Sequence, residues 1–154
     1  MKTIELTGGL KSIVDDEDYE KLKNFKWRCQ RIHSLRYAVS GSKEKTVLMH
    51  RLILEQKDGV LTDHRNGNGL DNRKENLRSC THAQNMMSRK IHKNNKSGFR
   101  GVYWYVQKRR WRSEIRFCGR KIYLGLHRDR DKAAISYDNA AKKYFGSFAR
   151  LNFN

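Results

Sequence analysis

The chain carries 34 Lys and Arg against 16 Asp and Glu in 154 residues, a formal net charge of +18. A charge of this size attracts polyanions, so a nucleic acid partner is favoured and a membrane partner is not expected. Hydrophobic residues make up 37% of the chain, no apolar run is long enough to span a bilayer, and the start, MKTIELTGG, lacks the apolar centre of a signal peptide. The composition therefore predicts one ordinary domain or two small ones in a soluble, intracellular protein.

The cysteines argue against a zinc knuckle and against a disulfide framework. Cys29, Cys80 and Cys118 are odd in number and widely spaced, and they include no CxxC pair. Both kinds of site need paired cysteines or other ligands at short spacing. We therefore expect free thiols and no structural zinc.

The charge divides the chain unevenly. Residues 1–90 hold 18 basic and 12 acidic side chains, whereas residues 91–154 hold 16 and 4. The segment between them is polar and basic and has no apolar periodicity. We expect a first domain at 1–90, a basic linker at 91–97 and a second domain at 98–154.

In the first domain the patterns predict short elements. A strand pair is expected at 2–14, with a turn at Gly8-Gly9. A helix should follow at 15–26, capped by Asp15 or Asp16, with Leu22, Phe25 and Trp27 on its apolar side. Next come strands at 36–39 and 46–49, a short helix at 50–56, and extended stretches at 60–64 and 77–80. An Asn- and Gly-rich loop separates the last two. Thr81 and Gln84 form a capping-box pattern, which predicts a helix running to about residue 90.

In the second domain three strands are expected, at 101–107, 110–117 and 120–125, joined by short turns. A helix should follow at 131–145, because its small and apolar residues recur at helical spacing. Asp129 or Asp131 would cap it, and Gly146 would end it. The whole chain is thus predicted as α+β, with a small three-stranded antiparallel sheet packed on one helix in its second half.

Four polar side chains of the first domain stand at suggestive positions. Asp63 and His64 end one extended stretch, Asn76 begins the returning one, and Asn85 falls in the first turn of the next helix. A strand hairpin packed on a helix can bring such groups to one point. An imidazole that titrates near neutrality can take a proton from water, and carboxylate and amide oxygens suit Mg²⁺ or Mn²⁺.

This pattern resembles the HNH nuclease family, in the branch of phage and intron homing endonucleases whose last motif residue is Asn. The segment 49–53, Met-His-Arg-Leu-Ile, matches the family's leading segment, and residues 71–78 match its central loop. The resemblance covers most of residues 1–90 and implies a ββα-metal fold. It also implies that His64 activates water, that the side-chain carbonyl of Asn76 accepts from the imidazole, and that Asp63 and Asn85 hold one metal ion.

Plainer interpretations remain open at these positions. Asp63-His64 could be a turn with a capping carboxylate, and the Asn-rich loop could exist only for its backbone conformations. Asn72 or His82 could take the place of the assigned motif residues. His50 either touches phosphate or braces the loop.

The second half resembles the plant ethylene-response-factor DNA-binding domain from about residue 97 to residue 154. The segments that carry the resemblance are Ser97–Trp104, Trp111–Arg116, Lys121–Gly125, Ala133–Ala141 and Leu151–Phe153. It implies a sheet face against the major groove of double-stranded DNA. The residues expected on that face are Arg100, Tyr103, Tyr105, Arg112, Glu114, Arg116, Lys121 and Tyr123. Plant members usually have Arg at the positions of Tyr103 and Tyr105, so base preference is not carried over. The alternative is a basic face that contacts nothing.

Three functions compete. The first is a site-preferring nicking or cleaving homing endonuclease, encoded by a phage or intron, acting as a monomer on DNA in the cytoplasm of a bacterial host. The second is a non-cleaving DNA-binding regulator built on a decayed nuclease. The third, an RNA-binding protein, is weaker, because neither an RRM signature nor a KH loop is present.

Overall fold

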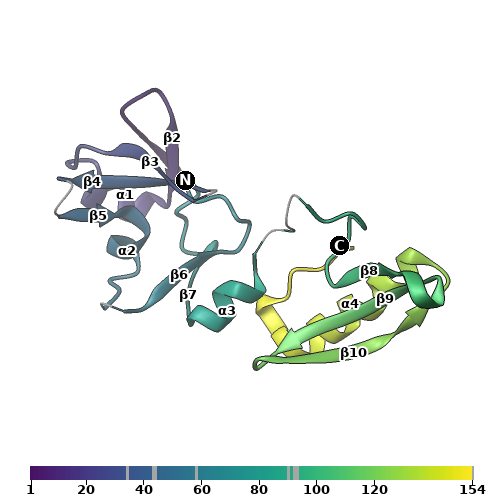
Figure 1. Cartoon of the computed structure of the whole chain (residues 1–154). Helices are drawn as coiled ribbons and strands as arrows, with labels where there is room; N and C mark the ends of the chain where they lie inside the picture. The colour runs from purple at the N-terminus through teal and green to yellow at the C-terminus, as the bar shows by residue number, and fades with distance from the viewer. Residues whose placement is uncertain (34, 43–44, 58, 90, 92–93, 154) are drawn as a thin grey trace. The chain divides into compact units, whose positions relative to one another are not determined.

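The structure is a computed structural model that describes residues 1–33, 35–42, 45–57, 59–89, 91 and 94–153 (Figure 1). It divides into two compact units, Met1–Asn85 and Met86–Asn154. The division falls inside helix α3 (His82–Met87), ahead of the boundary expected at residue 90. Helices and small antiparallel sheets occur in both units, which confirms the mixed α and β class. Across the described residues no helix combines the length and apolar character that crossing a bilayer requires.

The N-terminal unit contains, among its described residues, three small antiparallel sheets. Its elements are β1 (Lys2–Glu5), β2 (Lys11–Val14), α1 (Asp16–Leu22), β3 (Arg28–Ile32), β4 (Leu35–Gly41), β5 (Thr46–Leu48), α2 (Met49–Ile53), β6 (Leu61–His64), β7 (Leu77–Cys80) and α3. Each element expected from the sequence is present: β7 has the expected bounds, β4 is longer than expected, and the others are shortened or shifted. Strand β3 is an addition. The sequence of β3, RCQRI, gives little alternation of polar and apolar residues, and the strand is recognisable only from its pairing with β4.

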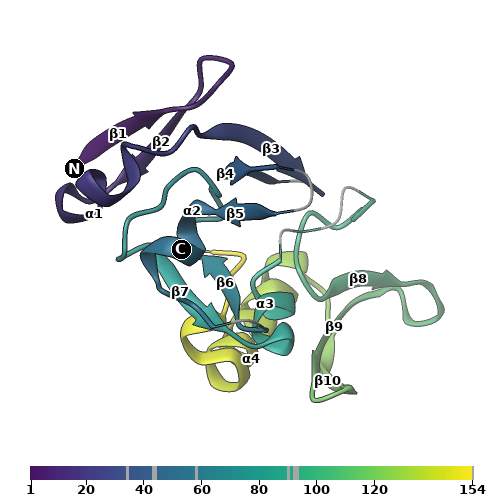
Figure 2. The same cartoon turned by 90° about the vertical axis from the view of Figure 1, so that its left-hand side faces the viewer.

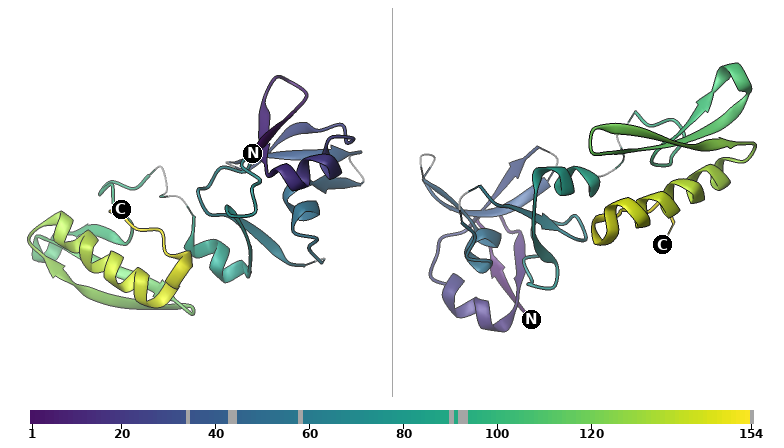
Figure 3. Two further views of the ribbon diagram at one scale, coloured as in Figure 1. Left: turned by 180° about the vertical axis from the view of Figure 1, so that it is seen from behind. Right: turned by 90° about the horizontal axis from the view of Figure 1, so that it is seen from below.

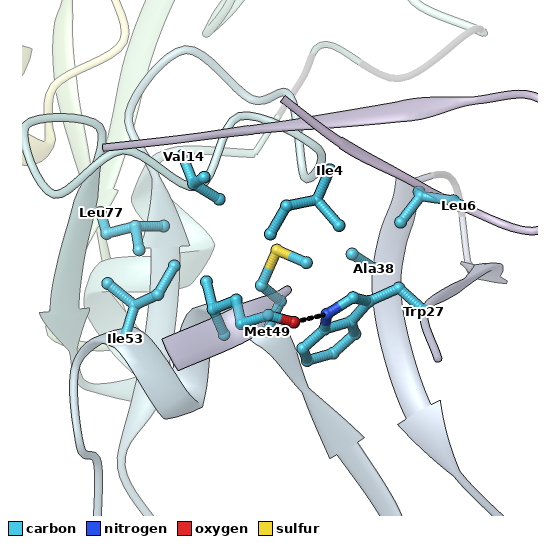
Figure 4. Packing of buried hydrophobic residues seen from close by; sticks show 9 residues of the cluster. Ile4, Leu6, Val14, Trp27, Ala38, Met49, Ile53 and Leu77 are labelled. Carbon is cyan, nitrogen blue, oxygen red and sulfur yellow. Dashed lines mark hydrogen bonds between the residues drawn. The ribbon is translucent and has the colours of Figure 1, made fainter. Parts of the chain in front are cut away.

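One hydrophobic core holds these elements together. Val14, Leu22 and Met49 are fully buried, and Trp27 beside them is 2% exposed (Figure 4). The Trp27 indole Nε1 donates to the Leu22 carbonyl at 2.8 Å, the dashed line in Figure 4. Burying each large apolar side chain is worth about 1.5–3 kcal/mol. Phe25, expected on the apolar side of the helix, is instead 41% exposed and lies against the Trp27 ring.

The hairpin of β6 and β7 is anchored to that core through Leu77. In its register His64 stands opposite Leu77, and Asp63 stands opposite Arg78. Helix α3 follows β7, which gives the order strand, strand, helix (Figure 2). The capping box is confirmed: the Thr81 amide donates to Gln84 Oε1 at 2.9 Å, and the Gln84 amide donates to Thr81 Oγ1 at 3.2 Å. The helix ends at Met87, before the expected residue 90, which lies outside the described residues.

The C-terminal unit is a three-stranded antiparallel sheet with one long helix along one face (Figure 3). Its elements are β8 (Val102–Tyr105), the 3₁₀ turn η1 (Val106–Lys108), β9 (Arg110–Phe117), β10 (Arg120–His127), α4 (Arg130–Phe145) and the 3₁₀ turn η2 (Gly146–Phe148), and β9 is the central strand. Ala133, Ala134 and Ala141 are fully buried, because a helix face of small side chains lets the backbone approach the sheet closely. This is the architecture expected for the second half of the chain.

The ends of α4 follow the sequence signals. Of the two candidate caps, Asp129 is used: its Oδ1 accepts from the amides of Asp131 at 2.8 Å and Lys132 at 2.9 Å. Gly146 ends the helix with a φ of 54°. At Gly101, where φ is 64°, an added Cβ would lie 2.1 Å from the Tyr137 ring, so only glycine fits there.

Part of the expected linker belongs to the C-terminal unit. Ser97 is 4% exposed, and its hydroxyl donates to the Val102 carbonyl at 2.6 Å. Asn95 Oδ1 accepts from the Gly98 amide at 2.7 Å. Residues 92 and 93 of the expected linker lie outside the described residues. The described part of 94–97 is therefore fastened to the sheet and is not a free arm.

Candidate nuclease site and DNA-facing sheet

Asp63 and His64 end strand β6 and are both buried, at 7% and 5% exposed. The His64 Nε2 lies 3.2 Å from Asn72 Oδ1, and Asn72 is fully buried. Burial lowers the pKa of His64 below its ordinary value, although the Asn72 contact and the Asp63 and Asp71 charges act in the opposite direction. A neutral imidazole at physiological pH is the form that can accept a proton.

The expected contact between Asn76 and the imidazole is corrected by the structure. Asn76 Nδ2 donates to the Asp71 carbonyl at 2.7 Å, and its Oδ1 accepts from the Asn66 amide at 3.0 Å. Both bonds close the loop between β6 and β7. Asn76 therefore braces the loop, and Asn72, which the sequence left as an alternative, lies against His64.

The same loop is tightened by a buried carboxylate. Asp71 is 2% exposed and accepts from Arg73 Nε and Nη2, each at 2.8 Å. It also accepts from Asn66 Nδ2 at 2.8 Å. These bonds, those of Arg73 foremost, hold the pKa of Asp71 below its usual range. A loop with this many internal bonds holds its end residues in fixed positions.

The rings of His50 and Tyr37 pack near the His64 ring. The His50 ring centroid lies 5.1 Å from that of His64, edge to face, and Tyr37 lies 5.5 Å from His50 and 5.8 Å from His64. Burial, with a smaller effect of the His64 and Arg51 charges, lowers the pKa of His50 to about 3. His50 is thus neutral at pH 7. Its position against the His64 ring supports the bracing role over the phosphate contact.

The donor set suits a hard divalent cation. Among the described residues no three His, Cys, Asp or Glu side chains converge on one point. A metal ion at this site would therefore depend on the Asp63 carboxylate, an amide oxygen of Asn85, water and substrate phosphate oxygens, a set that fits Mg²⁺ or Mn²⁺. The Asp63 Oδ2 also accepts from Arg78 Nε at 2.8 Å, which fixes the orientation of the carboxylate. Asn85 lies in α3, its backbone amide bonded to the Thr81 carbonyl at 3.0 Å.

The sheet of the C-terminal unit gathers seven of the eight expected DNA-facing residues by their register. Tyr103 stands opposite Arg112, Glu114 opposite Tyr123, and Arg116 opposite Lys121. Alternation along the strands places them, with Tyr105, on the face away from the buried Val102, Ser113 and Ile115. Tyr103, Glu114, Arg116 and Lys121 also line a shallow pocket of about 410 Å³.

Arg112 lies at the centre of this face. Its guanidinium carbon is 5.1 Å from the Tyr123 ring centroid, 5.6 Å from that of Tyr105 and 5.9 Å from that of Tyr103. The Tyr103 hydroxyl donates to Glu114 Oε2 at 2.8 Å. The face is thus a cation set among aromatic rings, with one carboxylate held at its side.

Arg100 does not belong to that face. It precedes β8 in a turn, and its Nη2 donates to the Arg89 carbonyl. Its own amide donates to Asn152 Oδ1 at 2.7 Å, which ties the turn to the chain's last residues. Burial lowers the pKa of its guanidinium. The expectation failed because a position two residues before a strand was treated as part of the strand's alternation.

Two residues of the N-terminal site, Ser12 and Tyr37, escaped sequence reasoning, and a third was considered only as an alternative. Ser12 is fully buried and its hydroxyl meets both the loop and Met49. Tyr37 packs on both histidines. Asn72 was considered only as an alternative to the assigned motif residues. The one available signal was the alternation of β2, which predicts that Ser12 points inward with Val14.

Comparisons with known proteins find one family model and several similar proteins. Residues 47–87 match the model of a family described as HNH endonuclease. A stretch of 58 residues is 45% identical to APETALA2-like protein 2 of Oryza sativa subsp. indica, covering 38% of this chain and 13% of the rice protein. A stretch of 66 residues is 41% identical to AP2-like ethylene-responsive transcription factor TOE2 of Arabidopsis thaliana. It covers 43% of this chain and 14% of that protein. The chain therefore spans about one seventh of the length of these plant relatives.

A phage protein is similar over a larger share of its length. Protein 3.8 of Escherichia phage T7 is 32% identical over 93 residues, which are 60% of this chain and 76% of protein 3.8. An alignment that spans three quarters of a relative reflects more than one shared motif. Residues 47–87 match the HNH endonuclease model, and the chain belongs to the family of phage T7 protein 3.8.

Proposed function

We propose that the chain is a metal-dependent DNA endonuclease whose C-terminal sheet holds it on double-stranded DNA. The observation that carries the proposal is the buried His64, next to Asp63 at the end of β6, inside the segment that matches the HNH endonuclease model. The net charge of +18 favours a polyanionic substrate. The lengths of the alignments with plant proteins, 58 and 66 residues, fit within the C-terminal unit.

In the proposed reaction His64 takes a proton from a water molecule whose oxygen forms a bond to phosphorus. The bond from phosphorus to the 3′ oxygen breaks on the opposite side. Asp63 and Asn85 would hold one Mg²⁺ or Mn²⁺, which stabilises charge on the phosphate and on the leaving oxygen. Asn76 keeps the loop closed, and His50 and Tyr37 keep water away from one side of the imidazole.

The finer assignment follows the same line. We infer a site-preferring enzyme of the homing type that acts as a monomer on DNA in the cytoplasm of a bacterial host. Similarity to a phage protein supports it, as does a separate sheet with charged and aromatic side chains on one face. Tyr105, Arg112, Glu114, Arg116, Lys121 and Tyr123, with Tyr103, would make the contacts to DNA.

The test is cleavage of supercoiled plasmid and of phage DNA with Mg²⁺ or Mn²⁺, followed by sequencing of the ends. The wild-type protein should nick or cut, and chelation should stop it. His64→Ala should lose about 10²- to 10⁴-fold in rate, the usual contribution of a general base, while binding DNA normally. His33→Asn, which removes an exposed imidazole from a turn where φ is 55°, is the matched control. Binding without cleavage of any DNA would favour the non-cleaving regulator, and full activity of His64→Ala would refute the proposal.

A further inference from the structure

A chain of buried hydrogen bonds links His64 to the hairpin of β1 and β2. The Ser12 hydroxyl lies 3.0 Å from the Leu70 carbonyl oxygen and 3.2 Å from Met49 Sδ. Asn72 Nδ2 lies 2.8 Å from Ser12 Oγ, and Asn72 Oδ1 lies 3.2 Å from His64 Nε2. Ser12 and Asn72 are fully buried, and His64 is 5% exposed. Water is thus largely excluded as an alternative partner along this chain.

The partners fix the direction of each bond. Asn72 Nδ2 lies 3.5 Å from Met49 Sδ as well as 2.8 Å from Ser12 Oγ, and a thioether sulfur only accepts, so the NH₂ group of Asn72 faces this side. The Leu70 carbonyl and the Met49 sulfur have no proton to donate, and the single hydroxyl proton of Ser12 goes to one of them. Ser12 Oγ then faces Asn72 as an acceptor, and Asn72 must present its NH₂ group there. The Asn72 carbonyl oxygen therefore faces His64. An amide oxygen only accepts, so the neutral imidazole must carry its proton on Nε2.

We propose that Ser12, acting through Asn72, is a positioning residue that fixes the tautomer of His64 with the proton on Nε2. The Nδ1 nitrogen is then the one that accepts the proton from water. This inference rests on the proposed nuclease function for its consequence in catalysis, although the tautomer itself does not depend on cleavage. Ser12 is separated from His64 by 51 intervening residues and contacts neither substrate nor metal in this scheme.

The backbone around the chain of bonds is secured independently of the Ser12 hydroxyl. The Asn72 amide donates to the Ile13 carbonyl at 2.8 Å, and the Ile13 amide donates to the Leu70 carbonyl at 2.8 Å. Ile13 and Asp71 form a parallel bridge. Removal of the hydroxyl alone should therefore leave the loop docked on β2 while releasing the direction of the Asn72 amide.

The experiment measures the ring nitrogens of His64 by ¹⁵N NMR in the full-length, metal-free protein at pH 8. Wild type should carry its proton on Nε2. Ser12→Ala should give a mixture of the two tautomers, because only the longer contact of 3.5 Å to Met49 Sδ then favours one orientation of the Asn72 amide. Ser12→Thr, which keeps a hydroxyl, should restore the wild-type state in whatever fraction folds. Ser113→Ala is the matched control: Ser113 is also fully buried, but it lies in β9, and its hydroxyl has no partner among the described residues.

Nicking of plasmid with Mg²⁺ gives the second measurement. In Ser12→Ala kcat should fall about five- to tenfold, the effect of one neutral hydrogen bond, with KM unchanged. A proton on Nδ1 in wild type, or a Ser12→Ala variant with unchanged tautomer and kcat, would overturn the inference. If wild type cuts no DNA, the nuclease proposal fails alone, and the NMR comparison still decides the positioning role of Ser12.

Discussion

In the N-terminal unit most polar side chains of the site are buried and bonded to one another, and Asn85 is half-buried, whereas in the C-terminal unit they lie on an open sheet face. Ser12, Asn72 and Asn76 are at most 5% exposed, while Tyr123 is 54% exposed. A group that must hold a proton and a metal in fixed geometry benefits from a rigid, water-poor setting. A group that meets phosphates and base edges must remain accessible. The contrast predicts that substitutions in the first unit cost stability and those in the second cost binding.

The largest expected effect is the loss of stability caused by substitution of Asp71. Asp71→Ala removes the acceptor of Arg73 and Asn66 from a buried position, so the free energy of unfolding of the N-terminal unit should fall by about 3 kcal/mol. Urea denaturation would measure it. Arg116→Ala, which removes an exposed cation from the sheet face, should cost below about 1 kcal/mol. Equal losses for the two variants would remove the contrast between the units.

Acid should destabilise the N-terminal unit through His50. Its folded pKa is about 3 against 6.5 for the unfolded chain, so unfolding takes up a proton between these values. The contribution of neutral His50 is complete above pH 6.5 and is lost as the pH falls towards 3. Between pH 7 and pH 5 the loss should be about 2 kcal/mol. His50→Phe should show a smaller drop in stability over this range, with His33→Asn as the exposed control; a pH dependence unaltered by His50→Phe would contradict the assignment.

Substitutions on the open sheet face of the C-terminal unit should lower the affinity for DNA and leave the free energy of unfolding nearly unchanged. Lys121→Ala removes an exposed cation of the face, so affinity should fall several-fold and the slope of log affinity against log salt should decrease by about one. Lys142→Ala removes the same charge from an exposed position on α4 and is the matched control. Titration of duplex DNA at several salt concentrations measures both. Equal loss in the two variants would mean that net charge, and not this face, determines binding.

Local signals in the sequence were sufficient for much of the fold. The capping box at Thr81 and Gln84 and the cap at Asp129 depend on residues three positions apart or fewer, and both are present as expected. The pairing of β8, β9 and β10 follows from short turns between alternating strands. Strand β3 was missed because its five residues carry no such alternation and depend on β4 for their partner.

Partners in the site that are distant in sequence could not be predicted in the same way. Ser12 and Asn72 are 60 residues apart and meet only because β2 and the loop share a backbone bridge. The resemblance to the HNH family implied that Asn76 is the partner of the imidazole, but a matching motif gives no information on which way a side chain turns within a closed loop. Arg100 failed for the related reason that a turn interrupts the strand pattern.

The smallest expected effect is that of an exposed ion pair in the N-terminal unit. It tests whether the loss of stability in Asp71→Ala arises from the burial of Asp71 or from its location in this unit. Lys21 and Glu55 form an ion pair of 2.7 Å in the N-terminal unit, and both side chains are exposed, at 47% and 76%. Solvent screening and the entropy of two long side chains offset most of the attraction. Lys21→Met should therefore leave the urea midpoint within measurement error, in contrast to Asp71→Ala in the same unit. A clear loss in Lys21→Met would mean that the N-terminal unit is sensitive to any lost charge, and that the burial of Asp71 is not the reason for its effect.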